Sequence, residues 1–144
     1  MIDFLDTSAL IKLYIAEDGS ERLARRVEDQ SVAVSDLAFA EVHATLARRL
    51  RESLLTIAEY QLTTRRFAAE WQGLIRVSVS QAVLQLVPGL CQRHPLRSAD
   101  ALQLASALML REEDLSVTLV ACDQRLLGSA AAEKLPVFDP TAAV

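Results

Sequence analysis

Four acidic residues stand where their side chains could do chemistry. Asp6 follows the apolar run IDFL, Asp123 follows VTLVAC, Glu41 lies in LAFAEVHATLA and Asp100 lies in RSADALQLASAL. A hard divalent cation can bind several carboxylates at once, and the two His and two Cys have no zinc-ligand spacing, which favours Mg²⁺ or Mn²⁺. Four acids from four regions would then form one metal site that activates water and neutralises a phosphoryl transition state.

Three of the four acids also have a simpler interpretation, and Glu41 is the exception. Asp6 and Asp123 could cap the helices that follow them, while Asp100 falls in a first helical turn, where an anion gains about 0.3 to 1 kcal/mol. Glu41 has no cation three or four positions away on its helix. A carboxylate on such an apolar face needs a cation from elsewhere in the fold, or its pKa rises.

The elements that must position these acids alternate along the chain. Short β-branched runs are expected to form strands at Ile2–Leu5, Ser31–Val34, Ile75–Val79, Val117–Ala121 and Pro136–Phe138. Helical patterns fall between nearly all of them: Ser8–Ile15, Ser20–Asp29, Asp36–Glu52, Thr56–Leu74, Gln81–Arg93 and Ala99–Leu110. We expect the two long central helices to form a hairpin, Pro88 to kink or break its helix, and Ser98 to cap the next one.

This alternation predicts an α/β fold with a central parallel sheet of about four to five short strands flanked by helices. A chain of 144 residues fits one domain, which we expect to span residues 1–144. Ligands bind at the carboxyl ends of the strands in open α/β sheets, and Asp6 and Asp123 both follow strands there. No segment resembles a secretory signal or a membrane span, so we expect a cytoplasmic protein.

The formal charge of −4 argues against nucleic-acid binding through net positive charge. The basic residues are nevertheless nearly all Arg, and several occur in clusters that could match phosphate oxygens or could be solvated helix faces. Arg48 lies two helical turns beyond Glu41, ~10 Å along the same face. We therefore consider Arg48 a candidate substrate-phosphate contact, with a solvent-facing Arg as the alternative.

The order and setting of the four acids resemble the PIN-domain ribonucleases, and the chain length and ADALQLA segment are most similar to VapC toxins of type II toxin-antitoxin systems. The resemblance implies a PIN-like fold and a Mg²⁺-dependent endoribonuclease, with Mn²⁺ as a possible substitute, that hydrolyses RNA phosphodiester bonds with metal-activated water. It assigns catalysis and metal binding to Asp6, Glu41, Asp100 and Asp123, with Asp6 and Asp100 as the main metal ligands. Ser8 would be a hydrogen-bonding helper near Asp6.

The same resemblance implies a homodimer, a cognate antitoxin protein that lies near the acids, and an RNA substrate. The positive mean hydropathy of +0.22 is consistent with apolar surface that a partner covers. The chain departs from many relatives at Ala121, where they carry Thr two residues before the last acid, and at Pro88 and Gly89.

Three other interpretations remain open at this stage. A phosphoacceptor signalling domain also places acids at strand ends around Mg²⁺, but it needs a Lys after a late strand, and Lys134 follows a helix. A dehalogenase-like site needs an acid at position 8, which is Ser. The third reading is a catalytically weak PIN-fold module that binds RNA or protein without cutting, which the Ala121 departure keeps open.

Overall fold

A computed structural model of the protein describes residues 1–113 and 115–143. It contains five strands: β1 (Ile2–Leu5), β2 (Ser31–Ser35), β3 (Ile75–Val77), β4 (Val117–Val120) and β5 (Val137–Phe138). The helices are α1 (Thr7–Leu10), the 3₁₀ helix η1 (Ile11–Leu13), α2 (Ser20–Val27), α3 (Leu37–Arg51), α4 (Ile57–Trp71), α5 (Gln81–Arg93), α6 (Ser98–Glu112) and α7 (Gln124–Ala132). The predicted alternation of strands and helices is confirmed.

The five strands form one parallel sheet in the order β3-β2-β1-β4-β5. The first strand is therefore central, with Leu5 paired to Val120 of β4 and Phe4 paired to Ala33 of β2. Every residue of β1 and β4 is buried, because helices cover both faces of the sheet. This register places the residues that follow β1 and β4 beside each other at one edge.

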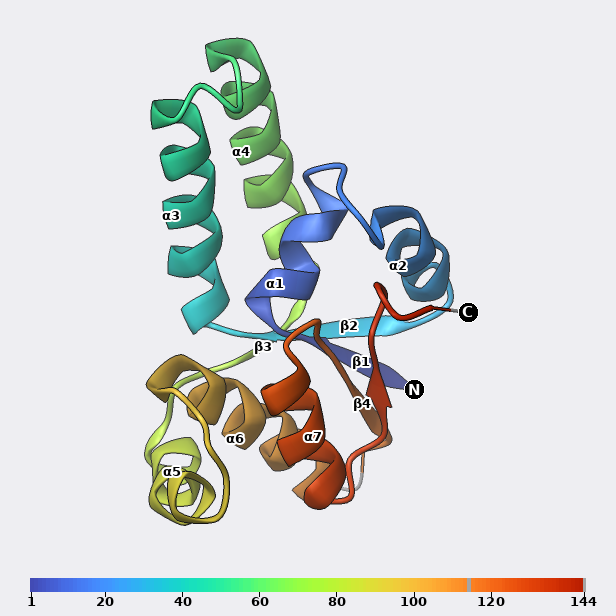
Figure 1. The fold of residues 1–144 in the computed structure, drawn as a ribbon, viewed down its shortest axis with the longest axis vertical. Helices are drawn as coiled ribbons and strands as arrows, with labels where there is room; N and C mark the ends of the chain where they lie inside the picture. Colours follow the sequence, from blue (N-terminus) through green and yellow to red (C-terminus); the bar gives the residue numbers. More distant parts are fainter. Residues whose placement is uncertain (114, 144) are drawn as a thin grey trace.

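The sheet separates two helical layers (Figure 1). The layer with α1 to α4 buries Leu5, Leu10, Val34 and Phe67 in one apolar core. The opposite layer, with α5, α6 and α7, buries Phe4, Leu104 and Leu119 in a second core. The most enclosed helix is α6, with eight buried residues.

Helices α3 and α4 form the predicted hairpin. The hairpin projects from the sheet (Figure 1). It reverses just before Thr56, whose side chain accepts a hydrogen bond from the Glu59 N–H while Glu59 bonds back to the Thr56 N–H. This reciprocal capping box fixes the start of α4. Phe67 and Trp71 then pack together at a ring separation of 5.5 Å and join the two helices to the core.

Three local expectations are wrong. Helix α5 runs as one helix from Gln81 to Arg93 with Pro88 inside it, so the expected break does not occur, although Pro88 removes one backbone N–H donor from the helix. Ser98 does not cap α6, because the helix begins at Ser98 itself and Arg97 occupies the cap position. The first expected helix divides into α1 and η1. Within the described ranges, no helix is long and apolar enough to cross a membrane.

Candidate active site

Asp6 lies at the carboxyl end of the central strand. Its Oδ1 accepts a hydrogen bond from the Ala9 N–H at 2.9 Å, so Asp6 caps α1, as the simpler interpretation expected. The Ser8 hydroxyl contacts both carboxylate oxygens at 2.8 and 2.9 Å. Ser8 thus makes the hydrogen bond to Asp6 that a helper role would need, and Ser8 itself is exposed.

The ionisation of Asp6 is strongly perturbed. Burial raises the pKa of Asp6 from 3.8 to about 6, against the opposing hydrogen bonds from Ala9 and Ser8, and the negative charges of Asp100 and Glu41 raise it further. Only 6% of the residue is exposed. Asp6, Glu41 and Asp100 are therefore close enough for their negative charges to repel one another.

Glu41 is the fifth residue of α3, the helix that follows β2. Its Oε1 accepts hydrogen bonds from the Thr7 hydroxyl at 2.7 Å and from Gln103 Nε2 at 3.2 Å. The cation that the sequence analysis required is not a side chain of the described residues, because Glu41 forms no ion pair among them. Two neutral donors occupy one oxygen instead.

Asp100 and Asp123 are partly buried and come from the second half of the chain. Asp100 is in the first turn of α6. Asp123 caps α7 by accepting from the N–H groups of Arg125 and Leu126 at 2.8 and 3.2 Å. Asp123 follows β4, the strand that pairs with β1 before Asp6, so it lies at the neighbouring strand end.

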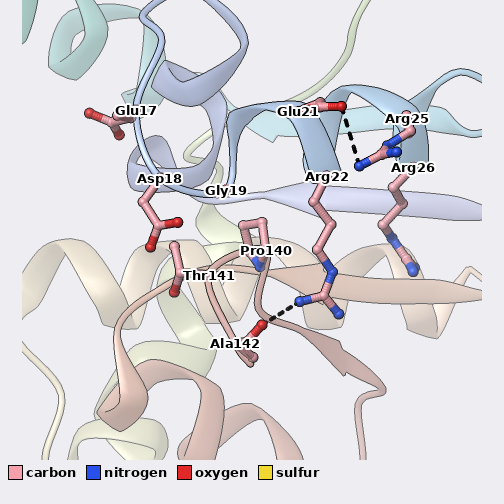
Figure 2. A pocket seen from close by; sticks show the side chains of 10 residues that line it. All are labelled: Glu17, Asp18, Gly19, Glu21, Arg22, Arg25, Arg26, Pro140, Thr141 and Ala142. Carbon is pink, nitrogen blue, oxygen red and sulfur yellow. Dashed lines mark hydrogen bonds and ion pairs between the residues drawn. The ribbon is translucent and has the colours of Figure 1, made fainter. Parts of the chain in front are cut away.

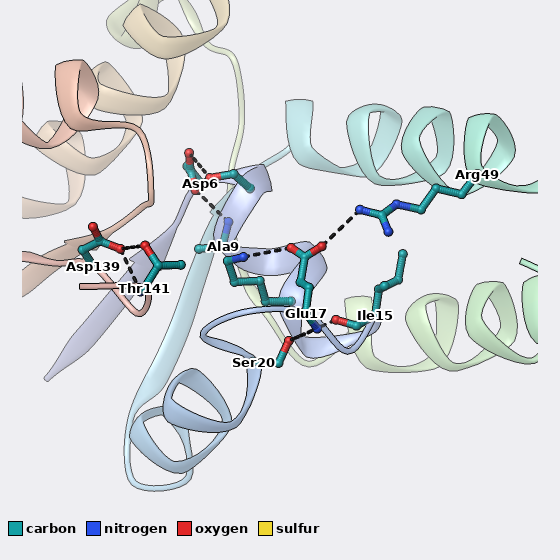
Figure 3. A network of polar contacts seen from close by, with 10 residues as sticks. Asp6, Ala9, Ile15, Glu17, Ser20, Arg49, Asp139 and Thr141 are labelled. Carbon is teal, nitrogen blue, oxygen red and sulfur yellow. Dashed lines mark hydrogen bonds and ion pairs between the residues drawn. The ribbon is translucent and has the colours of Figure 1, made fainter. Parts of the chain in front are cut away.

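The acids of the site differ from other acids in how they are held. Asp3 is paired with Arg26 at 2.8 Å. Glu17 is paired with both Lys12 and Arg49, at 2.9 and 3.1 Å, and Figure 3 shows the contact with Arg49. In the part of the chain that the structure describes, the four site acids form no ion pair with any Lys, Arg or His. Among the described residues, their negative charge is therefore not balanced by an ion-paired side chain.

This set of donors fits a hard cation such as Mg²⁺ or Mn²⁺. Among residues 1–113 and 115–143, no three acids, His or Cys lie close enough to ligate one ion directly. Mg²⁺ commonly keeps several waters and binds through only one or two carboxylates, so its coordination does not require a three-ligand cluster. Burial raises the pKa of the adjacent Cys122 to about 11, which disfavours the thiolate that a soft metal needs.

Sequence reasoning missed Thr7 and Gln103. Both are neutral, and neither type signals chemistry in an apolar helix or a helix start. The available signal was positional: Thr7 follows Asp6 directly, and Gln103 lies three residues after Asp100, on a neighbouring position of the same helix face.

Arg48 is exposed on α3 and forms no ion pair with the described residues, so the acidic partner of the alternative interpretation is absent there. The arginines of α2 are used internally. Figure 2 shows them beside a hollow of about 770 Å³ between α2 and the C-terminal segment, where Arg22 donates to the Ala142 carbonyl at 2.7 Å. Arg25 pairs with Glu21 on its own helix. Arg22 and Arg25 therefore contact groups of the protein itself.

The family model described as PIN domain matches residues 4–131. The chain belongs to the PIN-domain family. It is 35% identical over 124 residues to Ribonuclease VapC45 of Mycobacterium tuberculosis strain CDC 1551 / Oshkosh and to Ribonuclease VapC49 of strain H37Rv. Each alignment covers 85% of this chain and 85% of the relative, which places the chain with the VapC ribonucleases of that family.

A solved toxin-antitoxin complex from Klebsiella pneumoniae contains a chain of the same fold, with a TM-score of 0.68 at 18% identity. The match covers 96% of this chain and 97% of that chain. The predicted family and the PIN-like fold are thereby confirmed.

Proposed function

We propose that this protein is a Mg²⁺-dependent endoribonuclease and the toxin of a toxin-antitoxin pair. The observation that carries the proposal is the group of acids held only by neutral donors at the carboxyl edge of the sheet. The ribonuclease names of the relatives at 35% identity support the RNA substrate.

The side chains have separate tasks in this proposal. Asp6 and Asp100 would hold the ion, with Mn²⁺ as a substitute, and Glu41 and Asp123 would complete the site or orient the attacking water. Ser8 restrains both oxygens of Asp6. Arg48, exposed and without an acidic partner among the described residues, would contact a substrate phosphate.

When bound, Mg²⁺ would activate water and neutralise charge at the reacting phosphorus. Water adds to phosphorus, the bond to the 3′ oxygen breaks, and that oxygen takes a proton. The products then carry 5′-phosphate and 3′-hydroxyl ends. Ends with 2′,3′-cyclic phosphate would show attack by the RNA's own 2′-hydroxyl and contradict this mechanism.

The proposed partners are a cognate antitoxin and a second copy of the chain. The toxin-antitoxin complex of the same fold supports the first. Exposed apolar side chains at the α3–α4 turn, where Leu54, Ile57 and Leu62 are 64%, 67% and 69% exposed, support cover by protein.

The test is cleavage of a cellular RNA pool by the purified protein with Mg²⁺ or Mn²⁺, beside EDTA and the Asp100→Asn variant. We expect cuts only with metal and wild-type protein. Cuts that persist in EDTA would remove the metal from the proposal. Metal binding without cuts would instead favour a PIN-fold module that binds RNA or protein without cleaving it.

A further inference from the structure

The carboxylate of Glu41 is held by a clamp of two neutral side chains, Thr7 and Gln103. The Thr7 hydroxyl donates to Oε1 at 2.7 Å, and Gln103 Nε2 donates to Oε1 and to the Thr7 oxygen, both at 3.2 Å. Each member of the clamp therefore contacts the other two. Glu41 Oε2 accepts no hydrogen bond from the described residues and remains available.

The clamp joins the elements that carry the other acids. Thr7 opens α1 directly after Asp6, and Gln103 lies one turn beyond Asp100 on α6. The position of Glu41 on α3 is thus fixed relative to Asp6 through one donor and relative to Asp100 through the other. A small shift of either element would move Oε1.

Gln103 is poorly explained as a packing residue. It is 3% exposed within an apolar helix, and its Oε1 is buried with no hydrogen-bond partner among the described residues. An unpartnered buried oxygen destabilises the folded state, whereas Leu at this position would fill similar space without that cost. The amide is therefore expected to serve something other than stability.

The neutrality of the clamp has a chemical consequence. Glu17 is held by Lys12 and Arg49, whose charges cancel its own. Thr7 and Gln103 fix the carboxylate of Glu41 with similar contacts but leave its negative charge in place. A carboxylate that is both positioned and uncompensated is suited to a cation or to the water shell of a cation.

We propose that Gln103, acting with Thr7, is a positioning residue that orients Glu41 for the divalent ion of this site. The inference rests on the proposed metal-dependent function. Gln103 is not assigned any contact with RNA or with the ion.

The experiment compares wild type with Gln103→Leu, Thr7→Val and the double variant. Mn²⁺ affinity is measured by isothermal titration calorimetry, RNA cleavage by kcat and KM, and stability by thermal unfolding in EDTA. Each single variant should bind Mn²⁺ about 10- to 100-fold more weakly, since that is the usual effect of removing a group that orients a ligand. The kcat should fall while the KM for RNA stays within about twofold, because no RNA contact is lost.

Two further expectations separate positioning from a structural role. The metal-free Tm of Gln103→Leu should equal or exceed that of wild type, because the unpartnered oxygen is removed. The double variant should lose little more affinity than either single variant, because the clamp acts as a unit. Thr7→Ser, which keeps the hydroxyl, should recover most of the affinity lost in Thr7→Val.

The chain supplies matched controls. The Thr45 hydroxyl donates to the backbone carbonyl of Glu41. Ser106 lies one turn beyond Gln103 on α6, and its hydroxyl donates to the Leu102 carbonyl. Thr45→Val and Ser106→Ala should leave Mn²⁺ affinity unchanged. Wild-type affinity in Gln103→Leu, or a matching fall in its metal-free Tm, would overturn the positioning role while the proposed function stands. Absence of Mn²⁺ binding by wild type would overturn both.

Discussion

The raised pKa of Asp6 predicts that this carboxylate destabilises the metal-free protein at neutral pH. The shift from 3.8 to about 6 corresponds to about 3 kcal/mol, at 1.36 kcal/mol for each pKa unit. Because the folded-state pKa lies above the unfolded one, the favourable contribution is complete below about pH 4 and is lost as the pH rises through about 6. Asp6→Asn keeps an oxygen for the Ala9 N–H but carries no charge. We therefore expect the variant to be more stable than wild type at pH 7.5 by about 3 kcal/mol.

The assay is urea unfolding of both proteins in EDTA, at intervals between pH 4 and pH 8. The stability difference should be near zero at pH 4 and grow with pH, and Mg²⁺ should stabilise wild type only. A difference that does not depend on pH, or an Asn variant less stable at pH 7.5, would refute the reasoning from burial.

Asp139→Asn is the matched control, with the opposite sign. Burial alone would raise the pKa of Asp139, but hydrogen bonds from Thr141 and Gln124 hold it below its usual value. The stability from this carboxylate is present at neutral pH and is lost as the pH falls through the lowered pKa. Asp139→Asn should therefore weaken the protein at pH 7.5.

Two further substitutions test charges elsewhere. Arg26→Met should lower the free energy of unfolding by about 3 kcal/mol, because it leaves Asp3, 1% exposed, without its cation; Arg25→Met, at an exposed pair, should change it little. Urea unfolding measures both, and equal effects would contradict the role of burial. Arg48→Ala should weaken RNA binding and reduce the dependence of affinity on salt, as measured by fluorescence anisotropy. Unchanged binding by the Arg48 variant would remove it from the substrate contacts.

The sheet could be predicted because its information is local. Strands β1 and β4 are short apolar runs ended by polar residues, and a strand buried on both faces has this pattern. Their carboxyl ends carry Asp6 and Asp123, so the edge of the sheet that holds acids followed from the order of elements. The strand bounds are correct to within two residues for this reason.

What the sequence could not supply depends on tertiary surroundings. Helix α5 continues through Pro88, although the local pattern alone favours a break there. The clamp joins Glu41 to two neutral side chains that are distant in the sequence. Thr7 is 34 positions from Glu41, and Gln103 is 62 positions from it. Charge patterning indicates only a cation or a raised pKa for Glu41, and it does not reveal neutral donors such as Thr7 and Gln103.

The central position of β1 also governs when this protein can become complete during synthesis. Strand β1 takes β2 on one side and β4 on the other, so one of its edges lacks a neighbour until residues 117–120 have left the ribosome. A chain made only as far as residue 116 carries Asp6, Glu41 and Asp100 but not Asp123. The four acids can therefore come together only after Asp123, the last of them, has been synthesised.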